Sequence, residues 1–261
     1  MEITQKGICR LALAPIRNEP NDKSEMVTQL LFGDHYEILS SSQDMKWLKV
    51  KIVFDGYQGW LDASQHTTIS EEYFNQINNS NYKISLDISS GLLHNRNHIN
   101  VLLGSVLPIS TNELFKMEEQ LAFNGEAKSL SETRDFEFLK HIAFKYLNSP
   151  YLWGGKSPFG IDCSGFTQQV FRICGYSLKR DAYQQFEQGS DVVNPQAGDL
   201  AFFKNSKDKI SHVGIVLEDE TIIHASGKVR IDKLDGKGIY NEERLTYTHQ
   251  LVGFRRILRD S

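Results

Sequence analysis

The sequence predicts an α+β protein in which two small β-barrels precede a larger domain with helices first and antiparallel strands afterwards. Three observations lead to this expectation. Short strand patterns with turn residues fill the chain up to about residue 130. Hydrophobic residues then recur at helical spacing, and apolar strand patterns follow from residue 199. We therefore expect domains at residues 1–72, 73–130 and 131–261.

The composition is that of an ordinary globular protein. The 261 residues are 40% hydrophobic and 24% charged, with a formal net charge of −4. The basic residues form no cluster, and nucleic acid requires one to displace its counterions, so no nucleic-acid partner is expected. The longest uncharged apolar stretch, residues 99–110, is interrupted by Asn100, Gly104 and Pro108 and is too short to span a bilayer. We therefore expect no membrane partner.

Cysteine usage and the amino terminus predict a cytoplasmic protein. The three cysteines are few and odd in number, which does not suit a disulfide framework. Residues 1–10 lack the basic segment and unbroken apolar core of a secretory signal. A reduced, cytoplasmic setting is the expectation.

The first barrel is predicted from alternation and turns. Residues 47–53 alternate apolar side chains with lysines, which is the period-two pattern of a half-buried strand. Asp55-Gly56 supplies a turn, residues 57–61 form the partner strand, and residues 33–39 form an earlier strand. A weaker pattern with a turn at Asn124-Gly125 predicts a second, divergent barrel.

The third domain is predicted from helix signals followed by strands. Ser129-Leu130-Ser131-Glu132 fits a capping box, and Phe136 begins a helical repeat that Pro150 closes. A second helix is expected to start at Cys163 or Ser164 and to end at Gly175. A short polar helix at residues 181–188 and strands at residues 199–203, 211–217 and 221–225 complete the domain.

Cys163 is the candidate nucleophile because it lies where a loop is expected to become a helix. The thiolate is the reactive form of cysteine, and the partial positive charge of a helix start favours it. Glycines crowd the region, and backbone N–H groups of the helix start suit an oxyanion. We therefore expect an ionised sulfur. Cys9 and Cys174 are expected to be inert buried residues.

His212 and His224 are candidates for the base and its orienting partner. If residues 211–225 form a hairpin in which facing positions sum to 436, the two histidines are cross-strand neighbours with Cβ atoms about 5 Å apart. A Cys-His-His triad follows. With Cys163 they would also suit a zinc site, but no Cys-x-x-Cys or His-Glu-x-x-His spacing supports one, so no metal or cofactor is expected. The other six histidines are expected at the surface: His35, His66, His94, His98, His141 and His249.

Several motifs in order carry a family resemblance. They are Pro150–Gly155, Asp162-Cys163-Ser164-Gly165-Phe166, Gly198-Asp199-Leu200 and Ser211–Ile215. Residues 130–261 thereby resemble the NlpC/P60 cell-wall peptidases, which are papain-like cysteine hydrolases. Trp47-Leu48-Lys49-Val50 and Gly59-Trp60-Leu61 resemble bacterial SH3-like domains. The resemblance thus implies a papain-like NlpC domain behind two SH3-like barrels, as in the γ-D-glutamyl-L-diamino acid endopeptidases.

The resemblance also implies roles for individual residues. Cys163 is the nucleophile, His212 the general base and acid, and His224 the third member that orients it. Asp162 would hold the free α-ammonium of an amino-terminal L-Ala, a charge-assisted contact. The remaining implied substrate contacts are Glu25 and Tyr57 for the same ammonium, Tyr151, Trp153 and Ser164 in the pocket, and Asp181 at the D-Glu carboxylate. Ala182 departs from the serine that relatives often have there.

The implied function is cleavage of the γ-D-glutamyl–diamino acid bond in free murein stem peptides, with recycling in the cytoplasm. Two alternatives stay open. One is a wall-lytic peptidase that acts outside the cell on intact peptidoglycan. The other is a non-catalytic murein-binding protein with a decayed triad, although all three triad positions hold competent residue types. The diamino acid and the oligomeric state are not fixed by the sequence.

Overall fold

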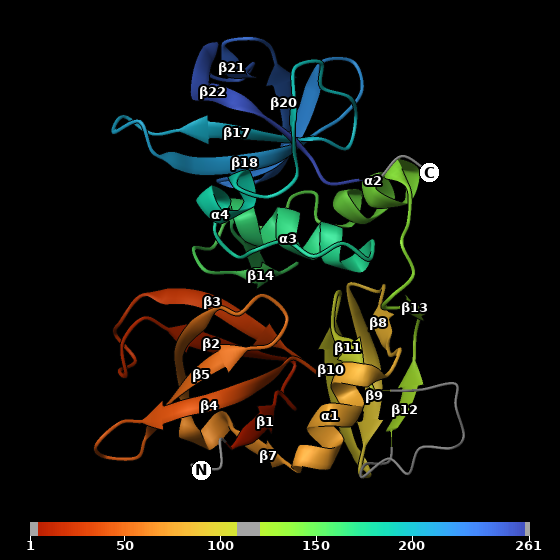
Figure 1. Ribbon diagram of the computed structural model, residues 1–261. Coiled ribbons are helices and arrows are strands. Elements are labelled where there is room, and N and C mark those ends of the chain that lie inside the picture. Colours follow the sequence, from red (N-terminus) through yellow and green to blue (C-terminus); the bar gives the residue numbers. More distant parts are fainter. Residues whose placement is uncertain (1–4, 109–120, 259–261) are drawn as a thin grey trace. The chain divides into compact units, whose positions relative to one another are not determined.

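The chain divides into two compact units, residues 1–132 and 133–261, in the computed structural model, which describes residues 5–108 and 121–258 (Figure 1). The predicted boundary after residue 130 lies two residues before this division. Within the described ranges, no helix combines the length and the hydrophobicity that crossing a bilayer requires. Part of the predicted second barrel, residues 109–120, lies outside the described residues.

The first part of unit 1 is a seven-stranded antiparallel sheet in the order β3-β2-β6-β5-β4-β1-β7. Leu48, Val50 and Ile52 are buried and Lys51 is exposed, so the predicted alternation is confirmed. These side chains pack in one core with Tyr36. The strands are β1 (Lys6–Ile8), β2 (Leu13–Arg17), β3 (Met26–Leu31), β4 (His35–Ser41), β5 (Trp47–Ile52), β6 (Gln58–Asp62) and β7 (Thr67–Ile69), with the short helix η1 (Ala63–Gln65).

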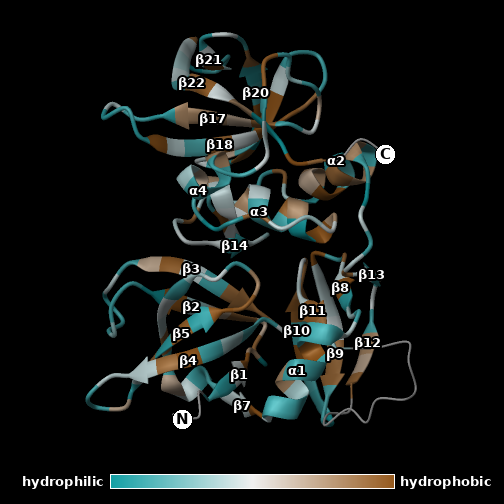
Figure 2. Ribbon diagram, in the orientation of Figure 1, coloured by the Kyte–Doolittle hydropathy of each residue, from teal (hydrophilic) through white to brown (hydrophobic). Residues whose placement is uncertain are grey.

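Helix α1 (Glu71–Asn79) joins the two parts of unit 1 and crosses the predicted boundary between residues 72 and 73. Its buried face carries Tyr73, Phe74 and Ile77, which share one core with Ile8 and residues of the second part. Much of its visible outer surface is hydrophilic (Figure 2). The expected boundary at residue 72 therefore falls inside a helix, and this helix shares a core with both parts.

The second part of unit 1 consists of two three-stranded antiparallel sheets, in the orders β10-β9-β12 and β11-β8-β13. A second SH3-like barrel stays a prediction. The strands are β8 (Lys83–Ser85), β9 (Ser89–His94), β10 (Asn97–Leu102), β11 (Val106–Leu107), β12 (Leu121–Asn124) and β13 (Ala127–Ser129).

Unit 2 has helices first and an antiparallel sheet afterwards, as predicted. Helices α2 (Phe136–Lys145), α3 (Cys163–Ile173) and α4 (Ala182–Phe186) lie on one side of the sheet (Figure 1). The sheet order is β16-β22-β17-β18-β19-β20-β21, and α3 packs against β18 and β19. The strands are β14 (Lys156–Ser157), β15 (Gly160–Ile161), β16 (Ser190–Val192), β17 (Leu200–Lys204), β18 (Ile210–Val216), β19 (Thr221–Ser226), β20 (Lys228–Leu234), β21 (Gly238–Asn241) and β22 (Thr246–Arg256).

The capping box predicted at Ser129 is wrong. Ser129 ends β13, where it pairs with Lys83, and its hydroxyl donates to the Asn81 side chain at 2.7 Å. Asp135 caps α2 instead, because its carboxylate accepts the Phe138 N–H at 3.1 Å. Strand pairing with a distant part of the chain outweighs the local capping signal.

Candidate functional site

The start of α3 is fixed by a buried carboxylate. Asp162 is the N-cap residue, and its Oδ1 accepts the Gly165 N–H at 2.7 Å. Its Oδ2 accepts the Gly154 N–H at 2.8 Å. Arg180 donates from Nη1 to Oδ1 at 3.0 Å and from Nη2 to Oδ2 at 2.6 Å, and this guanidinium is 1% exposed. Asp162 therefore holds three segments of unit 2 together.

The glycine at position 165 is required by this arrangement. A Cβ there would lie 2.3 Å from the Gly155 carbonyl oxygen and 2.9 Å from Asp162 Oδ1. Any side chain would push the first turn of α3 away from its cap. The glycines predicted to permit close backbone approach serve that purpose here.

Cys163 is the first residue of α3, as predicted, and its sulfur lies against β18. The Sγ atom is 3.9 Å from the Ser211 carbonyl oxygen, which it approaches as a donor. Ser211 directly precedes His212, so the thiol and the predicted base are brought to the same point of the strand. The whole cysteine is 5% exposed.

The prediction of a resting thiolate is contradicted. The pKa of the Cys163 thiol is raised to about 12. Burial is the largest cause and the negative charge of Asp162 acts in the same direction, whereas backbone groups of Val213 and Ser164 and the charge of Arg180 act against it. The favourable field of the helix start is outweighed by desolvation and by the carboxylate that caps the same helix. The raised pKa therefore favours the protonated thiol over the thiolate at neutral pH.

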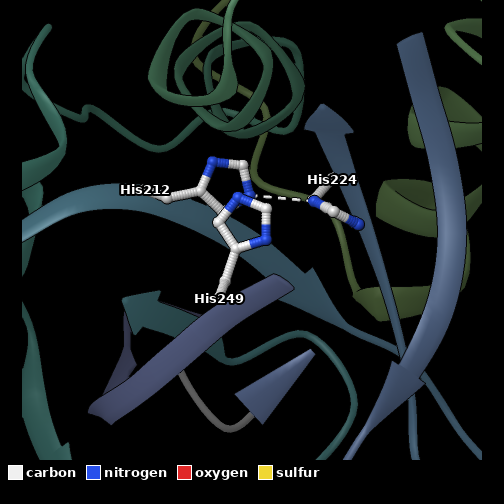
Figure 3. A group of neighbouring side chains, drawn as sticks. All are labelled: His212, His224 and His249. Carbon is white, nitrogen blue, oxygen red and sulfur yellow. Dashed lines mark hydrogen bonds between the residues drawn. The ribbon is translucent and has the colours of Figure 1, made fainter. Parts of the chain in front are cut away.

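His212 and His224 form a direct hydrogen bond. Nε2 of His212 lies 2.8 Å from Nδ1 of His224, and the two rings are nearly perpendicular (Figure 3). The predicted register is wrong by two residues. His224 faces Gly214 and not His212, so facing positions sum to 438 and not 436. The two histidines are therefore diagonal neighbours on one face of the sheet, a separation that aromatic side chains still bridge.

Gly214 makes the diagonal contact possible. A Cβ at this position would lie 2.8 Å from the His224 Cβ and 2.7 Å from the Ile222 side chain. With no side chain opposite His224, the His212 ring has room to reach across. Gly214 belongs to the family motif in the sequence, and this contact gives it a physical role.

Two further residues complete the cluster, and the sequence pattern predicts neither of them in this role. Asp232 on β20 lies with its Oδ2 3.0 Å from Nε2 of His224. His249 on β22, expected at the surface, stacks on His212 with ring centroids 4.0 Å apart and planes 23° apart (Figure 3). The Thr248 hydroxyl lies 2.9 Å from Nδ1 of His249.

The histidines of the cluster are held neutral. Burial lowers the pKa of His212 well below its ordinary value, and the neighbouring His224 and His249 lower it further. Burial also lowers the pKa of His224, although Asp232 acts in the opposite direction. Burial, helped by His224, lowers the pKa of His249 to about 4. At neutral pH the site therefore pairs a neutral thiol with neutral imidazoles.

A metal would have to compete with the hydrogen bond inside this cluster. Ligand nitrogens of His212, His224 and His249 all lie within 4.8 Å of one another, and Cys163 is not part of this group. Two nitrogens on tetrahedral zinc are roughly 3.4 Å apart, which is more than the 2.8 Å observed. The rings of His212 and His249 are stacked, so their in-plane lone pairs run side by side and do not converge on one metal ion. The described arrangement is thus that of a hydrogen-bonded base.

The structure places the other predicted pocket residues of unit 2 in different environments. The Ser164 hydroxyl accepts from Arg180 Nη1 at 3.0 Å, so Ser164 belongs to the frame around Asp162. Burial raises the pKa of the Tyr151 phenol, and the neighbouring Cys163 and Asp162 side chains act in the same direction. Trp153 is 59% exposed.

Asp181 and Ala182 lie at the start of α4. The Asp181 N–H donates to Gln184 Oε1 at 3.1 Å, and Ala182 is buried. No contact in the described residues tests the predicted role of Asp181 at a substrate carboxylate, so that role stays a prediction.

Glu25 and Tyr57 belong to unit 1. Glu25 is exposed just before β3, and its carbonyl oxygen accepts the Asn18 N–H at 2.9 Å. Tyr57 is half-buried against the core of the first sheet, and its N–H donates to Asp55 Oδ1 at 2.9 Å. Their role at a substrate ammonium stays a prediction.

The protonated thiol makes a testable difference to cysteine reactivity. We expect the rate of Cys163 alkylation by iodoacetamide to rise roughly tenfold per pH unit between about pH 6 and pH 9, because the reacting thiolate fraction grows that way below a raised pKa. Mass spectrometry of the modified peptide measures this rate, with Cys163→Ala as the blank. A rate that is already level across this range would show a preformed thiolate instead.

Comparisons with known proteins match both parts of the chain to families. Residues 148–247 match the NlpC/P60 family, and residues 16–65 match the bacterial dipeptidyl-peptidase SH3 domain. The chain is 29% identical to a γ-D-glutamyl-L-lysine dipeptidyl-peptidase of Bacillus subtilis, over 76% of this chain and 71% of that protein. It is 26% identical to the protein of the same name from Bacillus cereus, over 90% and 76%.

A solved structure shows the same fold. The crystal structure of an NlpC/P60 family protein from Bacillus cereus superposes with a TM-score of 0.82, at 21% identity, and covers 97% of this chain and all of that one. Unit 2 therefore has a papain-like fold, and an SH3-like domain precedes it in the sequence.

Proposed function

On the premise that the chain carries an NlpC/P60 peptidase domain preceded by a bacterial SH3 domain, we propose that it is a cysteine endopeptidase acting on free peptidoglycan stem peptides. The bond cleaved is the one between γ-D-glutamate and the L-diamino acid. The observation that carries the proposal is a hydrogen-bonded pair of neutral imidazoles, His212 and His224, together with a thiol at the start of α3 that contacts the carbonyl of Ser211, the residue before His212. The names of the two Bacillus relatives support the substrate class.

The proposed reaction proceeds through a thioester. His212 accepts the Cys163 proton as the sulfur attacks the γ-carbonyl carbon, and backbone N–H groups at the start of α3 stabilise the oxyanion. His212 then gives that proton to the leaving amine of the diamino acid. In the second half, His212 takes a proton from water as the water oxygen attacks the thioester carbonyl carbon. The carbon–sulfur bond breaks, and His212 returns the proton to the departing sulfur, which restores the thiol. His224 holds the His212 ring in place throughout.

A free amino terminus on the substrate is the finer part of the proposal. A dipeptidyl-peptidase removes a dipeptide from an amino end, so an unblocked L-Ala fits the names of the relatives. Asp162 was predicted to bind this ammonium, but its carboxylate already accepts from Gly154, Gly165 and Arg180. Glu25 and Tyr57 stay the other residues proposed for amine recognition. A stem peptide already freed from the glycan suits the proposed cytoplasmic recycling.

Acetylation of the substrate tests this requirement. We expect kcat/KM for L-Ala-γ-D-Glu-L-Lys to fall about 10- to 100-fold when its amino terminus is acetylated, the value of one lost charge-assisted hydrogen bond. Mass analysis of the products measures the rates and identifies the cleaved bond, and a diaminopimelate peptide compares the two diamino acids. Glu25→Gln should shrink the difference, and Glu19→Gln, also an exposed acid before β3, should not.

Purified sacculi distinguish the main alternative. The proposed enzyme releases almost nothing from sacculi, because L-Ala is amide-linked to muramic acid there. Equal hydrolysis of the free and acetylated peptides, together with release of fragments from sacculi, would favour a wall-lytic peptidase instead.

A further inference from the structure

Asp232 lies inward against the hydrophobic pattern of its strand. On β20 the apolar Ile231 is 39% exposed, whereas its charged neighbour Asp232 is 7% exposed. Burying a carboxylate is costly unless hydrogen bonds and opposite charge compensate it. A strand that turns its isoleucine outward to place an aspartate inside indicates that the carboxylate is needed there.

The groups around Asp232 favour its ionised form. Arg230 donates from Nη2 to Oδ1 at 2.9 Å, and its Nε lies 2.8 Å from Oδ2. The Asn241 amide donates to Oδ1 at 3.4 Å. Burial raises the pKa of Asp232, but the hydrogen bonds from His224 and Arg230 more than offset it, so the pKa is lowered overall. Asp232 is ionised and can only accept hydrogen bonds.

The proton positions in the two imidazoles follow from this fixed acceptor. The 3.0 Å contact with Asp232 requires the hydrogen on Nε2 of His224. Because His224 is neutral, its Nδ1 is then bare, and the 2.8 Å contact requires the hydrogen on Nε2 of His212. The neutral His212 ring is left with a bare Nδ1. This is the nitrogen with a lone pair to accept the thiol proton.

We propose that Asp232 is a fourth, positioning member of the catalytic centre, which fixes the tautomer of His224 and through it leaves Nδ1 of His212 unprotonated. The proposal rests on the peptidase function proposed above. Asp232 acts on the base, His212, only through His224, and it touches no reacting atom. His249 stacks on one face of the His212 ring (Figure 3), and its Nδ1 hydrogen-bonds to Thr248. It takes no part in the hydrogen-bond chain from Asp232 through His224 to His212.

Tautomers can be read directly in the substrate-free protein. In a ¹⁵N-labelled sample at neutral pH, long-range ¹H–¹⁵N correlation spectra distinguish protonated from bare ring nitrogens. We expect His212 and His224 to carry their protons on Nε2, and both to change in Asp232→Asn, whose amide can donate to His224. Finding the proton on Nδ1 of His224 in the parent protein would overturn the proposal. This experiment needs no substrate, so it is independent of the proposed function.

Kinetics with the tripeptide supply the second readout. Asp232→Asn should lower kcat/KM by about 100-fold or more, as loss of a tautomer-fixing carboxylate does elsewhere. The acid limb of the pH profile should move to lower pH, because removing the carboxylate charge makes the imidazoles weaker bases. Arg230 loses its partner at position 232 and keeps Glu243, and its positive charge, which lowers the pKa of His224, acts in the same direction. His249 keeps its contacts with His212 and Thr248.

Two variants control the kinetic result. Asp208→Asn, at an exposed aspartate paired with Lys204, should change neither quantity. Asp232→Glu, which keeps the carboxylate, should recover part of the activity and return the acid limb toward its original position. A loss of activity in Asp232→Asn with unmoved tautomers and an unmoved acid limb would reduce Asp232 to a structural residue and overturn the proposal.

Discussion

Cys163→Ala is expected to lower the rate of stem-peptide hydrolysis by on the order of 10⁴-fold or more while leaving peptide affinity nearly unchanged. The loss is large because every covalent step of the proposed reaction passes through this sulfur. Neither of the other thiols can replace it: Cys9 is buried in the core of the first sheet, and Cys174 is fully buried at the end of α3. Product formation by mass spectrometry and binding by calorimetry separate the two quantities.

The matched control is Cys174→Ala, which removes a thiol from the opposite end of the same helix. It should keep the parent rate. If Cys163→Ala turned over peptide at the parent rate, or if both variants lost activity equally, Cys163 would not be the nucleophile. Loss of peptide binding in Cys163→Ala alone would instead give the residue a role in substrate affinity.

The protonated thiol also shapes how this site works. A preformed thiolate–imidazolium pair stores the nucleophile in its reactive form. Here burial and Asp162 hold the proton on Cys163, and burial with two neighbouring histidines weakens the base. The nucleophile is therefore generated only as His212 takes the proton. Asp232, through His224, becomes the group that orients the base for that transfer.

Local patterns were enough to locate the main parts of the site. The helix that begins at Cys163 and the strands that carry His212 and His224 were all predicted from short stretches of sequence, because capping residues and apolar alternation act over a few residues. The hairpin register was not. Asp219 and Glu220 both take a positive φ of 55° in its loop. An acidic pair gives no sequence signal for that conformation, so the turn was placed one residue too early.

The missed residues depend on contacts between distant segments. His249 lies 37 positions after His212, and its stacking arises only because β22 and β18 both flank β17 in the sheet. The raised pKa of the Cys163 thiol likewise depends on its burial by residues distant in sequence, which a short stretch around Cys163 does not reveal. Asp232 did leave a signal, because neighbouring residues of a strand point to opposite faces and Ile231 and Asp232 differ in polarity. The sequence does not show, however, which of these two faces is buried.

The Arg180–Asp162 pair is the second feature with a large expected effect. Arg180→Met should lower the free energy of unfolding of unit 2 by about 3–5 kcal/mol, because it removes one partner of a buried, bidentate ion pair and leaves the other charge in place. Hydrogen exchange at the amides of α3 measures this loss within unit 2 alone. Arg244→Met, at an exposed arginine of the same unit, should cost less than about 0.5 kcal/mol.

The same variant decides between two roles for Asp162. If the carboxylate only anchors α3, the free and acetylated tripeptides should protect Arg180→Met no more than they protect the parent protein. If a substrate ammonium reaches Asp162, the free peptide replaces the lost positive charge and should protect the variant more than it protects the parent protein, whereas the acetylated peptide should not. A loss equal to that of Arg244→Met would mean that Gly154 and Gly165 alone compensate the carboxylate, and that the ion pair adds no net stability.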